Sequence, residues 1–125
     1  MVRNFRIVSV EDEEDTFNLL QLTLRDKPID WHHAANGTDA VEILTRIDPD
    51  LVLLDVMLPD MSGWDVLDQL RAQGRSLDGV PIIVLTARTE MPHRMIAAVQ
   101  EVAEYLPKPF SPADLRKVIK RILGI

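Results

Sequence analysis

The feature that most constrains the fold is a short apolar run that ends abruptly at a carboxylate, within residues 51–70. Residues 51–54 are all apolar, as in a strand covered on both faces of a parallel sheet, and Asp55 follows them directly. Ser62 and Asp65 have the spacing of a capping box, which predicts that a helix begins there. Ligands of open α/β sheets bind outside the carboxyl ends of the strands, so Asp55 is a candidate site residue. An aspartate after a strand is also a common turn former or helix cap, and this segment alone does not decide between the two.

Strand and helix alternate along the whole chain. Short apolar runs bounded by turn residues predict strands at residues 5–10, 29–34, 51–54, 80–85 and 105–106. The second run is the most polar, so we expect it at an edge of the sheet. Apolar stripes at helical spacing predict helices that begin near Asp15, Thr38, Ser62, Pro92 and Ser111, and the fourth extends to Glu104. Thr38 and Ser111 are the predicted caps of the second and the last helix. Five strands alternating with five helices predict an α/β fold with a doubly wound parallel sheet.

Composition excludes several classes of function. A chain of 125 residues predicts one domain over residues 1–125. Because it contains no cysteine, disulfides, thiolate metal sites and thiol catalysis are excluded. The net charge of −6 argues against nucleic acid as a direct partner. The sequence has no signal-peptide pattern and no apolar run of membrane length, so we expect a cytoplasmic protein without a membrane partner.

Right-handed crossovers bring the carboxyl ends of all parallel strands to one edge of the sheet, here called the carboxyl edge. Glu11 and Asp12 follow the first predicted strand, Asp55 follows the third, Thr86 the fourth and Lys108 the fifth. The sequence therefore predicts that three carboxylates, a hydroxyl and an ammonium group lie close together.

Three converging carboxylates repel one another, by about 1 kcal/mol per pair at about 4 Å in water and about 4 near a protein surface. A hard divalent cation removes this repulsion, and a few carboxylates with carbonyls and waters are the usual ligands of Mg²⁺. A carboxylate nucleophile with a metal ion, a lysine and a hydroxyl is typical of phosphoryl transfer to an aspartate.

Four segments carry a resemblance to a known family. They are VEDEED after the first strand, LLDVMLPDMSGWDVL, IIVLTAR and YLPKPFSPADL. In this order and spacing, over about residues 4–123, they resemble the response-regulator receiver domain of two-component signalling, the CheY-like family. The resemblance implies a flavodoxin-like (βα)5 fold with strand order 2-1-3-4-5.

The resemblance also implies roles for residues around the expected metal ion, Mg²⁺. Asp55 resembles the phosphorylated aspartate and Asp12 the direct metal ligand. Glu11 stands where the family most often has aspartate, and its longer side chain leaves the set of metal ligands open. Met57 is expected to offer its backbone carbonyl to the metal.

Three further residues resemble the parts of the family that respond to phosphate. Thr86 resembles the switch hydroxyl, Lys108 the phosphate-binding lysine and Tyr105 the aromatic residue whose rotamer follows phosphorylation. The Lys108–Pro109 bond is cis in the family, which an X-Pro bond permits.

The function implied is that of a phosphoacceptor signalling domain, which catalyses only its own phosphorylation and dephosphorylation and is not otherwise an enzyme. The expected donor is a histidine kinase or a histidine phosphotransfer protein. Phosphorylation is expected to switch a surface formed by the helix near residues 92–104, the last strand and the last helix. A downstream protein or an output domain would read that surface, and dimerisation through it is an open alternative.

Three other classes of protein share part of this pattern. A flavodoxin-like cofactor binder needs a phosphate loop rich in glycine, serine or threonine after the first strand, where this chain is acidic. An aspartate-nucleophile phosphohydrolase normally has its nucleophile after the first strand in a DxD pattern. A receiver-shaped module that accepts no phosphate would have lost part of the acid, hydroxyl and lysine set, and here every member is present.

Overall fold

The computed structural model describes residues 4–75, 77–87 and 102–125. The elements in these residues are β1 Phe5–Val10, α1 Glu14–Thr23, β2 Ile29–Ala34, α2 Gly37–Arg46, β3 Leu51–Asp55, α3 Gly63–Ala72, β4 Ile82–Thr86, β5 Glu104–Pro107 and α5 Pro112–Leu123.

All five predicted strands are present, whereas the described residues contain four helices and not five. The helix predicted near residues 92–104 falls mainly on residues 88–101, outside the described residues. Its predicted last residue, Glu104, is instead the first residue of β5.

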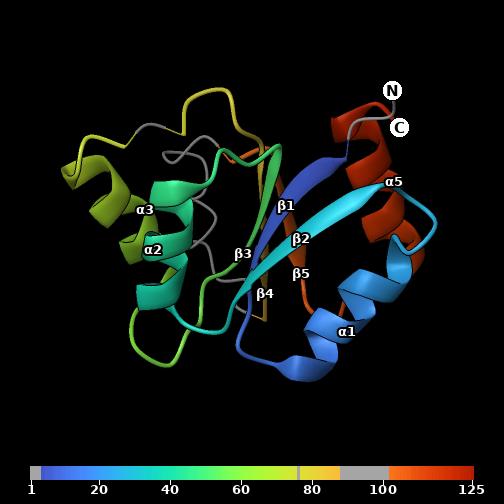
Figure 1. The fold of residues 1–125 in the computed structure, drawn as a ribbon. Helices are drawn as coiled ribbons and strands as arrows, with labels where there is room; N and C mark the ends of the chain where they lie inside the picture. The colour runs from blue at the N-terminus through green and yellow to red at the C-terminus, as the bar shows by residue number, and fades with distance from the viewer. Residues whose placement is uncertain (1–3, 76, 88–101) are drawn as a thin grey trace.

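The five strands form one parallel sheet in the order β2-β1-β3-β4-β5, which confirms the predicted flavodoxin-like topology. The polar strand β2 lies at an edge, as predicted. Helices α1 and α5 cover one face of the sheet and α2 and α3 the other (Figure 1). Because every crossover returns the chain to the same end of the sheet, all strands finish at the carboxyl edge.

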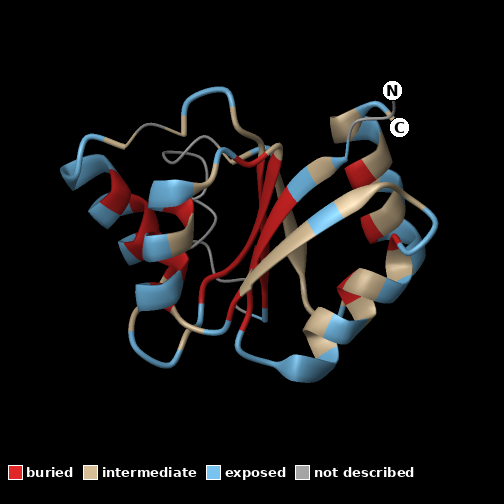
Figure 2. Ribbon diagram, viewed as in Figure 1, coloured by how far each residue is buried: buried red, intermediate tan, exposed pale blue. Residues whose placement is uncertain are grey.

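The core consists of two apolar clusters, one on each face of the central strands (Figure 2). Alternate strand residues face opposite sides, so each strand contributes to both clusters. The residues on the α2 and α3 side include Val8, Val10, Val52, Leu54, Ile82 and Val84. Those on the α1 and α5 side include Ile7, Leu51, Leu53, Ile83 and Leu85. Burial on both faces explains why β3 and β4 are continuous apolar runs and not alternating ones.

Two of the predicted helix starts are confirmed in their capping hydrogen bonds. The Ser62 side chain accepts a hydrogen bond from the Asp65 amide, and the Asp65 side chain accepts one from the Ser62 amide, which makes a complete capping box. The Ser111 side chain accepts a hydrogen bond from the Asp114 amide and so caps α5, with Pro112 at the first helical position.

The predicted cap of α2 is wrong. Asn36, and not Thr38, is the N-cap, because its side chain accepts a hydrogen bond from the Asp39 amide at 2.8 Å. The Thr38 hydroxyl donates instead to Asp60 Oδ2 at 2.7 Å, a contact with the loop between β3 and α3.

Among the helices described, none combines the length and hydropathy needed to cross a membrane.

Candidate functional site

The site is built where β1, β3, β4 and β5 end. Glu11 continues β1, and its amide donates to the Ala34 carbonyl of β2 at 3.0 Å. Asp55 is the last residue of β3 and Thr86 the last of β4. The Lys108 amide donates to the Thr86 carbonyl at 2.8 Å, so the hydrogen bonding between β4 and β5 extends as far as the lysine. Backbone pairing therefore fixes the starting points of all four side chains.

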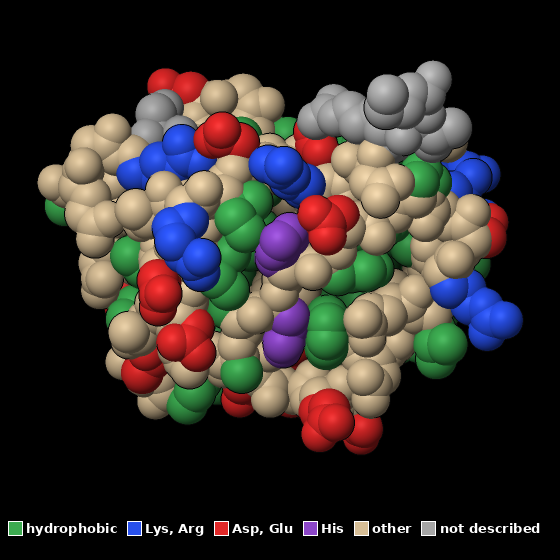
Figure 3. All heavy atoms as spheres, in the orientation of Figure 1, with side chains coloured by type: hydrophobic (Ala, Val, Ile, Leu, Met, Phe, Trp, Pro, Cys, Tyr) green, Lys and Arg blue, Asp and Glu red, His purple; other side chains and the backbone are tan. Residues whose placement is uncertain are grey.

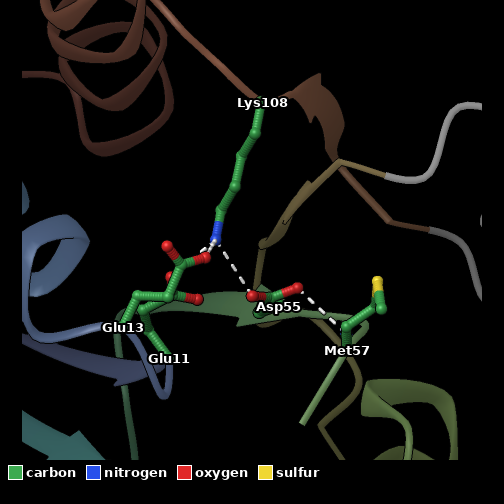
Figure 4. A network of polar contacts seen from close by, with 5 residues as sticks. All are labelled: Glu11, Glu13, Asp55, Met57 and Lys108. Atoms are coloured by element: carbon green, nitrogen blue, oxygen red, sulfur yellow. Dashed lines mark hydrogen bonds and ion pairs between the residues drawn. The ribbon is translucent and has the colours of Figure 1, made fainter.

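The Lys108 ammonium group is the centre of the site (Figure 4). Its Nζ lies 2.5 Å from Glu11 Oε1, 3.0 Å from Asp55 Oδ2 and 3.3 Å from Glu13 Oε1. The Glu11 and Asp55 side chains are 2% and 5% exposed, whereas that of Glu13 is 63% exposed. Two of the three ion pairs are therefore shielded from water, and the third is at the surface.

Burial and charge act together on the pKa values of this network. Burial, with the neighbouring Asp55 carboxylate, raises the pKa of Glu11 to about 8, although the Lys108 ammonium opposes the rise. Burial alone lowers the pKa of Lys108, but hydrogen bonds to Glu11 and Asp55 and their charges outweigh it, so the net shift is upward. The lysine therefore stays charged wherever the acids are ionised.

Asp55 is held by the backbone on both sides. The Met57 amide donates to Asp55 Oδ1 at 2.9 Å, which orients the carboxylate. Gly63, the first residue of α3, packs so closely that a Cβ there would lie 2.4 Å from the Asp55 carbonyl oxygen and 3.0 Å from Leu54 Cγ. Its amide also donates to the Val56 carbonyl at 2.8 Å. Only glycine allows the start of α3 to approach the end of β3 this closely.

The donor set suits a divalent cation. Glu11, Asp12, Glu13 and Asp55 each offer a carboxylate oxygen, and these four oxygens all lie within 4.8 Å of one another. Glu11 Oε2 is fully buried and has no hydrogen-bond partner among the described residues. A buried carboxylate oxygen without a partner is costly unless it is protonated or a cation binds it. Hard oxygen donors in excess over one lysine fit Mg²⁺.

The cluster opens into a cavity of about 340 Å³. Its lining residues are Asp12, Glu13, Asp55, Met57, Leu58, Pro59, Ala87 and Lys108. Met57 is 49% exposed at this position. A small anion could therefore reach both the Asp55 carboxylate and the Lys108 ammonium from solvent.

The two predicted switch residues lie on adjacent strands. Thr86 is completely buried and pairs in register with Pro107, and Tyr105 pairs with Val84. Tyr105 is half-buried and packs against the core cluster on the α2 and α3 side. The Lys108–Pro109 peptide bond is cis, as the resemblance implied.

The structure thus brings together every predicted site residue at the carboxyl edge, apart from Tyr105, which lies farther back along β5. Sequence reasoning missed Glu13, which contacts the lysine, although it is the third acid of the VEDEED segment. It also missed the close approach of Gly63. Arg88 is predicted to border the path of attacking water because it follows Thr86 by two residues, and it lies outside the described residues.

Comparison with known proteins identifies the family. Residues 7–120 match the model of the response regulator receiver domain, so this chain belongs to that family. Receiver domains are signalling domains of two-component systems, which confirms the resemblance found in the sequence.

Two curated relatives cover most of the chain. The DNA-binding response regulator MtrA of Mycobacterium tuberculosis (strain ATCC 25618 / H37Rv) is 38% identical over 110 residues, which cover 88% of this chain and 46% of MtrA. The alkaline phosphatase synthesis transcriptional regulatory protein PhoP of Bacillus subtilis (strain 168) is 37% identical over 120 residues, which cover 96% of this chain and 49% of PhoP. The chain spans about half the length of the curated relatives it matches.

Solved structures show the same fold. The receiver domain of a putative Luxo repressor protein from Vibrio parahaemolyticus superposes with a TM-score of 0.86 at 29% identity, covering 98% of this chain and 92% of that one. Chemotaxis response regulator CheY4 of Vibrio cholerae gives 0.84 at 26% identity, covering 97% and 100%.

Proposed function

We propose that this chain is a single receiver domain over residues 1–125 that accepts a phosphoryl group on Asp55. The observation that carries the proposal is the contact of Asp55 Oδ2 with Lys108 Nζ at 3.0 Å, inside a cluster of four carboxylates at the carboxyl edge. Asp55 lines the cavity at the carboxyl edge, through which a donor can reach it. It also lies beside the fixed positive charge of Lys108. Phosphoryl transfer depends mainly on positioning and on neutralising charge, and this arrangement supplies both.

In the proposed reaction an Asp55 oxygen attacks phosphorus and forms an O–P bond. The bond from phosphorus to the donor breaks, and the leaving group, a histidine nitrogen or an acyl oxygen, keeps the electron pair. Lys108 donates to an oxygen of the transferred group, and the Thr86 hydroxyl is the second donor. Bound Mg²⁺, held by Glu11, Asp12, Asp55 and the Met57 carbonyl, would neutralise charge on that group.

The donor we propose is a histidine kinase or a histidine phosphotransfer protein. The aspartyl phosphate adds nearly one further negative charge at Asp55, which draws Thr86 and Lys108 toward it. Through Thr86 and Tyr105 this biases the surface near β5 and α5, which a downstream protein, an output domain or a second copy would bind. Self-phosphorylation and dephosphorylation are the only chemistry that we propose for the chain.

We also propose that the chain acts in the cytoplasm and does not itself bind nucleic acid. The relative MtrA is named a DNA-binding response regulator, which stands partly against this proposal, but MtrA is about twice as long as this chain. The net charge of −6 supports the proposal that this chain does not bind nucleic acid. On the face that carries β2, acidic and basic side chains are mixed, without one continuous basic surface (Figure 3).

The test uses acetyl phosphate and Mg²⁺ with intact-mass measurement. The wild type should gain one phosphoryl group, and Asp55→Asn should gain none under the same conditions. Asp68→Asn, a matched control on the exposed side of α3, should be labelled like the wild type. Labelling of Asp55→Asn at the wild-type stoichiometry would move the acceptor to another residue.

A further inference from the structure

Glu13 is an acid that the reaction described above does not use. It is the N-cap residue of α1, yet its side chain makes no capping hydrogen bond. Instead its carboxylate lies 3.3 Å from Lys108 Nζ and within 4.8 Å of the oxygens of the three other acids. It also lines the cavity through which Asp55 is reached. The side chain is therefore turned toward the site and not toward its own helix.

Lys108 has three N–H donors, and they face three carboxylates. A phosphoryl group on Asp55 needs one of these donors, so one carboxylate has to give way. Glu11 is buried and makes the shortest contact, whereas Glu13 is 63% exposed and makes the longest. Water can replace the lysine as a partner of Glu13 but not of Glu11. Glu13 is thus the carboxylate that Lys108 can release at the lowest cost.

The charge of Glu13 also acts on what enters the cavity. A bound divalent cation keeps all four carboxylates ionised, so the four acids, the lysine and the cation sum to −1. An acyl phosphate dianion approaching that surplus is repelled. Without the Glu13 charge the same site would be neutral.

We propose that Glu13 tunes the site by its charge: it strengthens binding of the divalent cation and slows phosphoryl uptake from small dianionic donors. The proposal rests on the proposed function of Asp55. The two effects have opposite signs, whereas a merely structural role for Glu13 would weaken cation binding and uptake together. Glu13 is therefore a specificity-determining residue that disfavours dianionic small donors relative to monoanionic ones.

The experiment compares Glu13→Gln with Glu14→Gln. Both variants lose one acidic charge in the first turns of α1, but Glu14 lies outside the cluster and the cavity. The initial rate of phosphorylation is measured at saturating Mg²⁺ with acetyl phosphate, a dianion, and with phosphoramidate, a monoanion at neutral pH. The Mg²⁺ dissociation constant is measured separately by titration without any donor.

In low salt, Glu13→Gln should be phosphorylated by acetyl phosphate at least about fivefold faster than the wild type, since two unit charges about 4 Å apart in water interact by about 1 kcal/mol and a dianion feels more. The gain should be smaller with phosphoramidate and should shrink in high salt, where exposed charges are screened. Its Mg²⁺ affinity should fall by a similar factor. Glu14→Gln should match the wild type in all three measurements.

An unchanged rate in Glu13→Gln, or an equal gain in both variants, would overturn the proposal. So would a rate and a Mg²⁺ affinity that fall together. If the wild type took up no phosphoryl group, the proposed function of Asp55 would fail by itself. The Mg²⁺ titration would still decide the role of Glu13, because equal affinities in the two variants would exclude it from the cation site.

Discussion

Replacing Gly63 by alanine tests how the start of α3 positions Asp55. The added Cβ would lie 2.4 Å from the Asp55 carbonyl oxygen and 3.0 Å from Leu54 Cγ. Ordinary contacts of this kind begin at 3.4 Å, so the backbone of β3 or α3 must move by about 1 Å. Overpacking of this kind costs about 1–3 kcal/mol, and the better helix propensity of alanine returns at most about 1. We therefore expect a net loss of about 1–2 kcal/mol.

In urea this loss corresponds to a midpoint lower by about 0.3–2 M, given slopes of about 1–3 kcal/mol per molar. The same shift of the Asp55 backbone should slow phosphorylation, because the carboxylate moves relative to Lys108. Gly37→Ala is the matched control. Gly37 is also the first residue of its helix, but the closest atoms to its added Cβ belong to the flexible Met61 side chain. It should therefore lose less stability and keep its phosphorylation rate.

Equal urea midpoints and equal rates for Gly63→Ala and the wild type would refute this reasoning. That result would mean that β3 and α3 separate without cost. A loss of stability with an unchanged phosphorylation rate would show that the close contact supports the fold but does not position Asp55.

Two further predictions concern pH. His33 lies 3.0 Å from Ser9 Oγ and stacks on Phe17, and burial lowers its pKa below 6.5, so the unfolded chain binds the proton more strongly. The stabilising effect of neutral His33 is complete above about pH 6.5 and is lost as the pH falls. In urea unfolding, His33→Gln should therefore reduce the dependence of the free energy of unfolding on pH in this range. An unchanged dependence would contradict the role given to His33. Hydrogen bonds from the Gly37 amide and from Thr38 lower the pKa of Asp60 to about 2. The contribution of Asp60 to the free energy of unfolding is therefore complete above about pH 4 and lost toward pH 2. Asp60→Asn should be less stable than the wild type at neutral pH, and the difference should disappear in acid; a constant difference would refute the prediction.

The fold was predictable because its signals are local. Runs of buried residues such as 51–54 mark strands by their own composition, and Ser62 and Ser111 lie next to the amides they cap. The cap of α2 was not predictable in this way. Thr38 has the right chemistry for a cap, but its hydroxyl is taken by Asp60, 22 residues away in the sequence. The competition between Asn36 and Thr38 is decided by a tertiary contact.

The site shows the same division. Asp55, Thr86 and Lys108 could be placed together because parallel topology alone brings strand ends to one edge. The contact between Glu13 and Lys108 joins residues 95 apart and depends on which way an exposed side chain turns. The close approach of Gly63 to Asp55, where an added Cβ would lie 2.4 Å from the carbonyl oxygen, depends on the packing of α3 on β3. Topology therefore predicted which groups meet, and side-chain packing decides how many of them share the lysine.

The excess of acids over lysine at the carboxyl edge predicts that Asp55→Asn stabilises the metal-free protein. Asp55 has one ammonium at 3.0 Å and three carboxylates whose oxygens lie within 4.8 Å. Above about pH 8, where Glu11 is ionised as well, the three repulsions at these distances exceed the one attraction by about 1 kcal/mol in water. Urea unfolding in this pH range without Mg²⁺ should therefore give a free energy of unfolding about 1 kcal/mol higher for Asp55→Asn than for the wild type. Asp68→Asn, which removes a carboxylate paired with Arg71 outside the cluster, should show no such gain. Added Mg²⁺ should reverse the order, because it binds the folded wild type more tightly and stabilises it by mass action. If Asp55→Asn were less stable than the wild type without Mg²⁺, the attraction between Asp55 and Lys108 would outweigh the repulsion among the acids. The acidic cluster would then stabilise the fold without a metal ion, contrary to this prediction.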